Sequence, residues 1–230
     1  MNIIWLGHSG FRIEIADQVL LVDPWLSGNP VFAEDRRDEA IAGATHILLT
    51  HGHFDHASDA PDIAAELGIP ILAIPELAEL VEATDGVKAM DFNKGGTISL
   101  EEVSVTMVNA CHSSSFKTGD GMVYAGKEAG FMIHGEGHVI YVSGDTDIMA
   151  DMAWMGAYYQ PDIGILACGG HYTMDMKAAA WAAKKYFDFK TVIPCHYRTF
   201  PLLAQSAKVL ADALPGIDVI EPQVMQPITL

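Results

Sequence analysis

A dense group of potential metal ligands lies at positions 51 to 56, which hold His51, His53, Asp55 and His56. Imidazole and carboxylate groups together suit borderline divalent metals such as zinc, manganese, iron or nickel. In an extended segment the residues at 51 and 53 would lie on one side, whereas those at 55 and 56, where the chain turns, could reach a second ion. A solvated polar loop is the alternative, but it gives no reason for such a density of histidine. The pattern therefore predicts a site for two metal ions.

Three further candidate ligands lie downstream, each just beyond an apolar run that predicts a strand. The runs and the residues that follow them are 103–109 with His112, 138–143 with Asp145, and 190–194 with His196. Because strand ends at one edge of a sheet meet in space, these groups can build one site with the first cluster. Asp145 carries two oxygens and could bridge two ions. Taken singly, each residue could instead be a helix cap or a loop group with a satisfied hydrogen bond.

The pattern of apolar residues predicts the elements that would hold these groups. Short runs at 2–6, 11–15 and 19–23 are separated by turn residues, which predicts an antiparallel meander. Further along, strands alternate with helices, as in βα units. The remaining predicted strands are 45–49, 70–74, 97–100, 103–109, 129–134, 138–143, 162–167 and 190–194, and the predicted helices are 59–67, 76–83, 147–156, 174–186 and 201–213.

Each half of the chain thus has a β-rich block followed by βα alternation. The simplest packing places two mixed sheets face to face with helices on the outside, which is a four-layer αββα sandwich of the α/β class. No shift in composition marks a linker, so residues 1–230 are predicted to form a single domain.

The charge balance excludes some classes of partner. Thirteen Lys and Arg against thirty Asp and Glu give a formal net charge of −17, which disfavours binding to nucleic acid or to an anionic membrane. No uncharged apolar stretch reaches the ~18 residues of a membrane helix. The three cysteines, Cys111, Cys168 and Cys195, are too few and too widely spaced for a disulfide framework, which favours a reducing compartment. We expect a cytoplasmic protein with a small-molecule substrate, and the sequence leaves a homo-oligomer open.

The order His-x-His-x-Asp-His, followed by His112, Asp145 and His196, resembles the five-motif signature of the metallo-β-lactamase superfamily. Other segments resemble a branch of small bacterial metal-dependent hydrolases, to which ascorbate-phosphate lactonases are similar. These segments are 6–11 (LGHSGF), 22–24 (VDP), 111–115 (CHSSS), 143–146 (SGDT), 169–174 (GGHYTM) and 193–197 (IPCHY). The likeness extends from Met1 to about Glu221 and implies the αββα fold that the apolar pattern also predicts.

The resemblance also implies how the ligands divide between two metal positions. His51, His53 and His112 would bind the first ion, Asp55, His56 and His196 would bind the second, and Asp145 would bridge both. The sequence departs from the family pattern beside two ligands, at Cys111 and Cys195. A residue next to a strand-end ligand usually points the opposite way, so we expect both cysteines to be small buried hydrophobes and not ligands.

Several other roles are expected around the ligands. His8 and His171 lie in Gly-flanked loops, where each could donate to the substrate or its oxyanion, or could merely fix its loop by a hydrogen bond. Asp23 ends a strand beside Pro24 and is expected to orient a ligand histidine, the alternative being a turn-forming Asp. Asp55 could also orient the nucleophile or pass a proton. His8, Asp55 and His171 are therefore the candidate catalytic residues.

The predicted site favours hydrolysis. Two divalent ions, two carboxylates and a bridging hydroxide leave a pocket charge of about +1, which would attract a small ester, lactone or phosphoester despite the acidic chain. Adjacent metals lower the pKa of bound water to about 7 and polarise the scissile group. Two alternatives remain. One is a di-iron oxidoreductase, a branch that usually has a carboxylate at the position of His53; the other is a non-catalytic metal-binding protein, which is expected to have lost a ligand.

Overall fold

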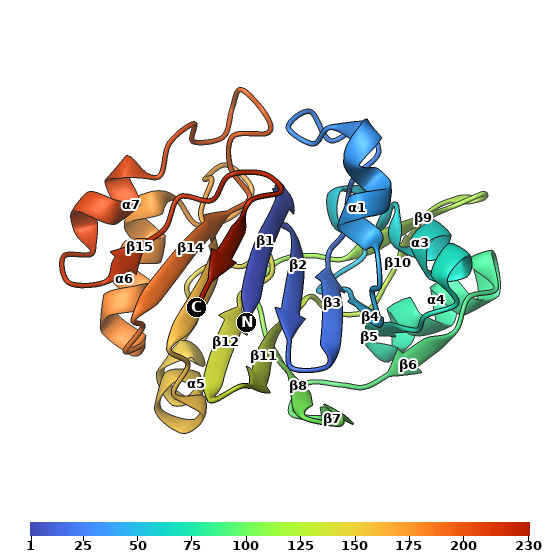
Figure 1. Cartoon of the computed structure of the whole chain (residues 1–230), viewed down its shortest axis with the longest axis horizontal. Helices are drawn as coiled ribbons and strands as arrows, with labels where there is room; N and C mark the ends of the chain where they lie inside the picture. Colours follow the sequence, from blue (N-terminus) through green and yellow to red (C-terminus); the bar gives the residue numbers. More distant parts are fainter.

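The computed structural model describes all residues, 1–230, and shows two large mixed sheets flanked by helices (Figure 1). The first sheet has seven strands in the order β16-β1-β2-β3-β4-β5-β6. These strands are β16 (Pro227–Thr229), β1 (Asn2–Gly7), β2 (Gly10–Ile15), β3 (Gln18–Val22), β4 (His46–Leu48), β5 (Ile71–Ala73) and β6 (Ala89–Asp91). Strands β1 to β3 form the predicted antiparallel meander, and β3 to β6 pair in parallel.

The second sheet repeats this division into an antiparallel and a parallel part. Its order is β15-β14-β13-β12-β11-β8-β7, with antiparallel pairing from β7 to β12 and parallel pairing from β12 to β15. The strands are β7 (Thr97–Leu100), β8 (Val103–Asn109), β11 (Ala129–Gly135), β12 (His138–Val142), β13 (Ile163–Ala167), β14 (Thr191–Cys195) and β15 (Asp218–Val219). A separate hairpin is made by β9 (Ser115–Thr118) and β10 (Gly121–Tyr124).

Alternating burial along the strands explains why the sheets pack as they do. In β2, Phe11, Ile13 and Ile15 are buried, while the intervening Arg12 and Glu14 are half-buried and form a salt bridge with each other. Strands of the parallel part are buried throughout, as in β13 and β14, because both of their faces are covered. One continuous core of 67 buried residues results, drawn from both sheets and their helices.

Helices cover the sheets on both sides of the molecule (Figure 1). Helices α3 (Ala60–Leu67) and α4 (Pro75–Asp85) pack against β4, β5 and β6, whereas α5 (Met152–Tyr159), α6 (Met176–Tyr186) and α7 (Lys208–Ala213) form a contiguous group beside the second sheet. The shorter helices are η1 (Glu34–Arg36), α1 (Arg37–Ile41) and α2 (Phe54–Ala57). The Asp175 carboxylate caps α6 by accepting from the backbone N–H groups of Lys177 and Ala178. No helix combines the length and the apolar character that a bilayer crossing requires.

The predicted αββα fold class is confirmed, and the differences lie in helix limits and in short strands. The helix predicted at 147–156 begins only at Met152, and the one predicted at 201–213 is restricted to α7 because the segment before it forms turns. The apolar pattern did not predict α1, β6, the β9–β10 hairpin, β15 or β16. Each of these elements is short, and the edge strands β6, β15 and β16 depend on pairing with a neighbour in the sheet.

Candidate metal centre

The seven predicted ligands follow strand ends at one edge of the sandwich. His51 and His53 come after β4, His112 after β8, Asp145 after β12 and His196 after β14, while Asp55 and His56 lie in the first turn of α2. Strands β8 and β12 both pair antiparallel with β11 and so run in the same direction, and β12 to β14 are parallel. The carboxyl ends of these strands therefore lie together, and the structure brings all seven residues into one cluster.

Three overlapping groups of ligand atoms make up this cluster, and within each group the atoms lie within 4.8 Å of one another. The groups are His51, His53 and His112; His51, His56 and Asp145; and His8, Asp55, His56 and His196. Asp145 lies between the outer groups, since its Oδ2 is 3.0 Å from His196 Nε2, 3.4 Å from His56 Nε2 and 3.6 Å from His112 Nε2. This is the placement expected of a carboxylate that bridges two ions.

Unpaired polar atoms on residues of the cluster indicate that it fits a cation. Among the six buried side-chain nitrogen and oxygen atoms of the chain that lack a hydrogen-bond partner, two are His56 Nε2 and Asp145 Oδ1. A third is His196 Nδ1, which lies on the side of the ring away from Asp145, because Nε2 of this ring faces that carboxylate. A buried polar atom without a partner costs about 1–3 kcal/mol. Imidazole nitrogens and a carboxylate oxygen are the donors that zinc and similar ions take, so an ion bound here would satisfy Nε2 of His56 and the free oxygen of Asp145.

Asp23 lies behind the ligands and holds two of them in place. Its carboxylate accepts hydrogen bonds from His56 Nδ1 at 2.8 Å, from the Thr50 backbone N–H at 2.8 Å and from the Thr50 hydroxyl at 2.6 Å. Because the Thr50 hydroxyl donates to Asp23, its oxygen accepts from Nδ1–H of His51 at 3.0 Å. Both imidazoles are thereby turned so that Nε2 faces the centre of the cluster. The expected contact of Asp23 with a candidate ligand histidine is present, and Thr50 makes a similar contact with a second one.

Burial and charge set the protonation of the cluster. Burial lowers the pKa of His51, His53 and His112, which keeps these imidazoles neutral and able to bind a cation. Burial acts in the same direction on His56, but the carboxylates of Asp145 and Asp23 outweigh it and raise the pKa of His56 well above its usual value. Burial alone would raise the pKa of Asp145, yet the neighbouring imidazoles of His196 and His56 lower it.

His8 is buried beside Asp55, in the group of potential ligands that also contains His56 and His196. Its Nε2 lies 3.0 Å from Asp55 Oδ2, and its Nδ1 contacts the hydroxyl of Thr199. Burial lowers the pKa of His8 to about 4, so the ring is neutral at pH 7 and can donate from one nitrogen only. Burial opposes the charge of Asp55, but the hydrogen bond from His8 and the nearby His56 hold the pKa of Asp55 below its usual range. Thr199, which the sequence reasoning missed, carries no motif signal of its own.

His171 lies at the margin of this arrangement. Its side chain is exposed, its ring packs edge-on against Tyr172 at 4.6 Å between centroids, and it makes no hydrogen bond to the cluster. Tyr172 in turn lies 6.4 Å from the ring of His196. A contact between His171 and substrate stays a prediction. The expectation of two buried cysteines is wrong for Cys111, which is exposed, and correct for Cys195. Cys111 lies beyond the end of β8, where the alternation of a strand no longer applies.

The loops around the cluster are tightly constrained. His8, Asp23 and His196 have positive φ angles of 53°, 44° and 56°, a conformation that non-glycine residues adopt rarely and that is concentrated at functional sites. Gly169 is also required, because a Cβ atom there would lie 1.9 Å from the backbone oxygen of His196. The backbone thus holds the ligands in a fixed arrangement.

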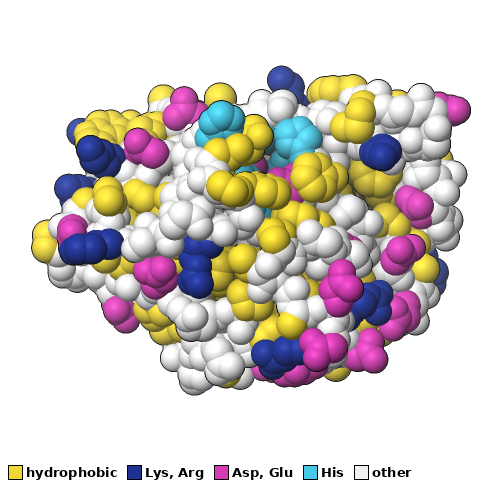
Figure 2. All heavy atoms as spheres, turned by 90° about the horizontal axis from the view of Figure 1, so that it is seen from above, with side chains coloured by type: hydrophobic (Ala, Val, Ile, Leu, Met, Phe, Trp, Pro, Cys, Tyr) yellow, Lys and Arg dark blue, Asp and Glu magenta, His cyan; other side chains and the backbone are white.

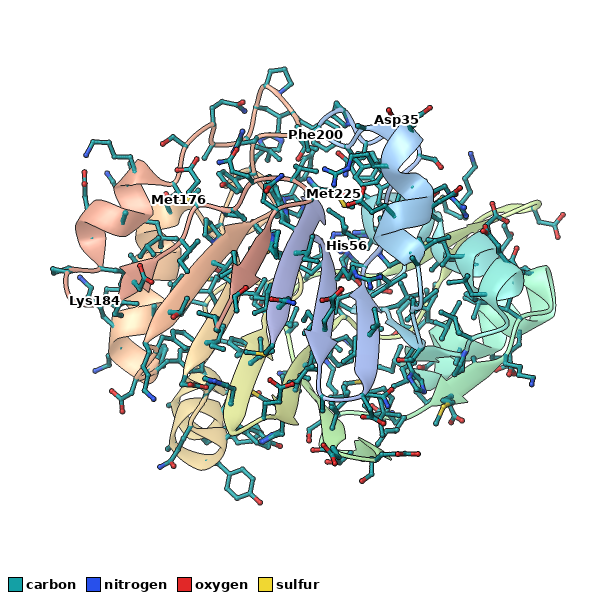
Figure 3. The ribbon with its side chains drawn as sticks, viewed as in Figure 1. Asp35, His56, Met176, Lys184, Phe200 and Met225 are labelled. Carbon is teal, nitrogen blue, oxygen red and sulfur yellow. The ribbon has the colours of Figure 1, made fainter.

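The cluster opens to the surface at this edge. Viewed from above, histidine side chains are visible among hydrophobic side chains, with acidic atoms in the hollow between them (Figure 2). His56 lies in the interior and Phe200 above it (Figure 3).

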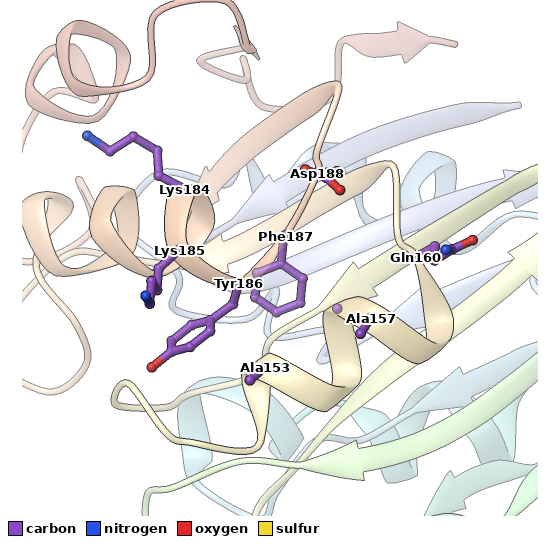
Figure 4. Close-up of a pocket in the computed structure, with 9 residues that line it drawn as sticks. Ala153, Ala157, Gln160, Lys184, Lys185, Tyr186, Phe187 and Asp188 are labelled. Atoms are coloured by element: carbon purple, nitrogen blue, oxygen red, sulfur yellow. The ribbon is translucent and has the colours of Figure 1, made fainter.

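A separate depression lies between α5 and the end of α6 (Figure 4). Its lining includes Gln160, Lys184, Lys185, Tyr186 and Asp188. It adjoins the amino-terminal ends of β13 and β14, the edge opposite the ligands. It contains no cluster of potential metal ligands, and we assign it no part in the chemistry.

Comparison with known proteins agrees with this geometry. Residues 18–197 match the family model of the beta-lactamase superfamily domain. The chain is 68% identical over 230 residues to a UPF0173 metal-dependent hydrolase of Paracoccus denitrificans and 68% identical over 230 residues to another of Cereibacter sphaeroides, with 100% of each chain covered. It is also similar to the solved structure of Igni18, a metallo hydrolase from the archaeon Ignicoccus hospitalis, with a TM-score of 0.82, 29% identity, and 100% and 98% of the two chains covered. The chain therefore belongs to the beta-lactamase superfamily and, within it, to the UPF0173 family of metal-dependent hydrolases.

Proposed function

We propose that this protein is a hydrolase with a two-metal centre that acts on a small ester, lactone or phosphoester. The observation that carries the proposal is the convergence of seven candidate ligand residues, with Asp145 between the two outer groups and unpaired buried atoms on His56 and Asp145. His51, His53 and His112 would hold one ion, Asp55, His56 and His196 would hold the other, and Asp145 would serve both. Zinc is the first candidate by donor chemistry, with manganese, iron and nickel as alternatives.

The two ions, when bound, would supply a Lewis acid for the scissile carbonyl or phosphoryl oxygen and lower the pKa of water. The residues of the chain would prepare that chemistry. Asp23 and Thr50 fix the rings of His51 and His56, and His8 holds the carboxylate of Asp55 by donating from Nε2. Because these partners are buried or half-buried and hydrogen-bonded, the ligand atoms need little rearrangement when a cation or substrate binds.

We assign separate roles to the three candidate catalytic residues. Asp55 would bind metal through one oxygen and keep its other contacts with His8, whose neutral ring fixes the carboxylate and its charge. His171, exposed at the rim beside Tyr172, would donate a hydrogen bond to substrate. His8 is therefore a positioning residue, whereas His171 would contact the reacting molecule.

We further propose a small-molecule substrate and a reducing, cytoplasmic setting. Cys111, Cys168 and Cys195 all carry free thiols, and a formal net charge of −17 disfavours a nucleic-acid partner.

The test is hydrolysis of a panel of lactones, carboxylic esters, thioesters, phosphodiesters and phosphorylated lactones by metal-analysed protein. His51→Ala is the matched control, since it removes a ligand from a loop over an intact core and should abolish turnover while retaining the fold. Turnover of at least one class that His51→Ala lacks supports the proposal. Silence across the panel, or equal turnover by the variant, would contradict it.

A further inference from the structure

Apolar side chains surround the opening of the metal centre. Phe54 and Tyr172 are 58% and 52% exposed, respectively. Phe54 lies between the ligands His53 and Asp55 in the sequence, and Tyr172 lies 6.4 Å from the ring of His196. Hydrophobic side chains are visible around the hollow in Figure 2. Exposed apolar surface at the mouth of a binding site indicates a ligand that would cover it.

The rings of Trp25, Phe54 and Phe200 pack together into what we call the aromatic wall, in which Trp25 is buried and Phe54 and Phe200 carry the exposed face. The ring of Trp25 lies 5.5 Å from Phe54 and 6.0 Å from Phe200, centroid to centroid. Trp25 Nε1 donates to the backbone oxygen of Ser27, so the polar atom of the indole is already used. The wall therefore offers hydrocarbon, and no free donor, to a molecule in the site.

The wall flanks only one side of the cluster. Trp25 and Phe200 lie 5.4 Å and 5.5 Å from the ring of His8, which in turn packs 4.0 Å from the ring of His196. On the other side, next to His53, lies the hydroxyl of Ser113, 3.5 Å from His53 Nε2. A substrate can thus place a polar part towards His53 and an apolar part towards His8.

No lysine or arginine forms an ion pair with the carboxylates of the cluster. Every ion pair of Asp23, Asp55 and Asp145 is with a histidine. Arg198, close to His196 in sequence, is turned away: it stacks 5.8 Å from the ring of Trp5 and lies 3.9 Å from Glu221. Sites that recognise phosphate usually provide arginine or lysine donors.

The hollow on the outer side of Phe54 does not change this balance. It lies against the β9–β10 hairpin, and its one lysine, Lys117, is accompanied by Asp62 and Asp85. Its titratable lining is therefore acidic on balance, which disfavours a phosphorylated group there as well.

We propose that the substrate is a neutral ester or lactone with an aliphatic or aromatic acyl group, and that this group lies on the aromatic wall. The proposal rests on the hydrolase function given above and specifies its substrate class. Hydrophobic burial supplies the selectivity, because each methylene that leaves water strengthens binding. A wall on one side of the acyl group would remove about half of the surface of each methylene from water. Affinity should therefore rise roughly twofold for each methylene added to the acyl group.

The experiment measures the binding of product-like straight-chain carboxylates, from acetate to octanoate, to zinc-loaded protein by titration calorimetry. Affinity is expected to increase roughly 60-fold over the series, and hexanoate should bind more tightly than inorganic phosphate. In Phe54→Ala and Phe200→Ala the increase should fall to less than about 10-fold. Tyr158→Ala is the matched control, because Tyr158 is a 76% exposed aromatic on α5, outside the wall, and it should behave as the unaltered protein.

Equal affinities for acetate and octanoate, or tighter binding of phosphate than of hexanoate, would overturn the proposal. Binding requires no turnover, so these results are separate from the outcome of the hydrolysis panel. The dependence on chain length should also persist in the metal-free protein, although absolute affinities will be weaker. Loss of the dependence in Tyr158→Ala to the same degree as in Phe54→Ala would equally contradict a role for the wall.

Discussion

Replacing Asp23 by Asn should weaken metal binding without removing any ligand. The carboxylate accepts three hydrogen bonds, two from Thr50 and one from His56. An amide offers only one oxygen, so whichever way it turns, its NH2 group faces at least one of these donors. His56 can relieve the clash by giving up the proton on Nδ1 and keeping one on Nε2, which is the atom that should bind the cation.

The size of the effect follows from these contacts. Loss of one hydrogen bond to a buried charge costs about 1.5–3 kcal/mol. For a chain of 230 residues the entropy of unfolding is about 0.5 kcal/mol per degree, so the metal-free variant should melt about 3–6 °C lower. Disturbing an outer partner of a ligand histidine typically lowers metal affinity about 10- to 100-fold.

Zinc affinity would be measured by competition with a chromophoric chelator, and stability by thermal unfolding. Asp162→Asn is the matched control: Asp162 also accepts from a histidine, His138 at 2.8 Å, and from a backbone N–H, that of Val139 at 2.9 Å, but at the opposite end of β12. The control should lose stability and keep its zinc affinity. An Asp23→Asn protein that binds zinc within twofold of the unaltered protein would refute the assigned role.

Three further predictions concern protons and packing. Because Asp145 and Asp23 raise the pKa of His56, zinc binding near pH 7 should release about one proton, and zinc affinity should rise with pH. The released proton would be detected as a calorimetric binding enthalpy that varies with the ionisation enthalpy of the buffer. A binding enthalpy that is independent of the buffer would contradict this prediction. His8 has a folded pKa of about 4, below its unfolded value, so the metal-free protein should lose roughly 2 kcal/mol of unfolding free energy as the pH falls from 7 to 5. The His8→Gln variant should not show this loss. Urea unfolding at both pH values measures it, and the same pH dependence in the two proteins would count against the prediction. Gly169→Ala should lower the free energy of unfolding by about 3 kcal/mol or more, because the added Cβ atom would meet the backbone oxygen of His196. Gly28→Ala, where the Cβ atom would enter open space, should lower it by about 1 kcal/mol. Equal melting temperatures for the two variants would contradict the packing argument.

The positions of the ligands could be predicted because their chemistry and their place after strand ends are both local features of the sequence. The cluster at 51–56 and the residues His112, Asp145 and His196 need only a sheet with aligned strand ends to meet. Other parts of the site depend on contacts between distant loops. Thr199 reaches His8 across 191 positions, and nothing in its neighbourhood marks it. The aromatic wall likewise combines three segments, around Trp25, Phe54 and Phe200.

The fold class was predictable for a similar reason, since the meander and the βα units have clear apolar periods. Strand β16 was not, because it is short and forms by pairing with β1 at the other end of the chain. The β9–β10 hairpin did carry a signal, the turn residues from Gly119 to Gly121, which favour a tight reversal. The segment 201–207 has apolar residues at helical spacing, yet it folds as turns that bring Phe200 to the ring of His8.

The most direct test of a two-metal centre is anomalous diffraction at the zinc absorption edge from crystals of the zinc-loaded protein. Two peaks about 3.5–4 Å apart are expected, one beside His51, His53 and His112, the other beside Asp55, His56 and His196, with Asp145 in contact with both. A single peak, or zinc bound away from these seven residues, would contradict it.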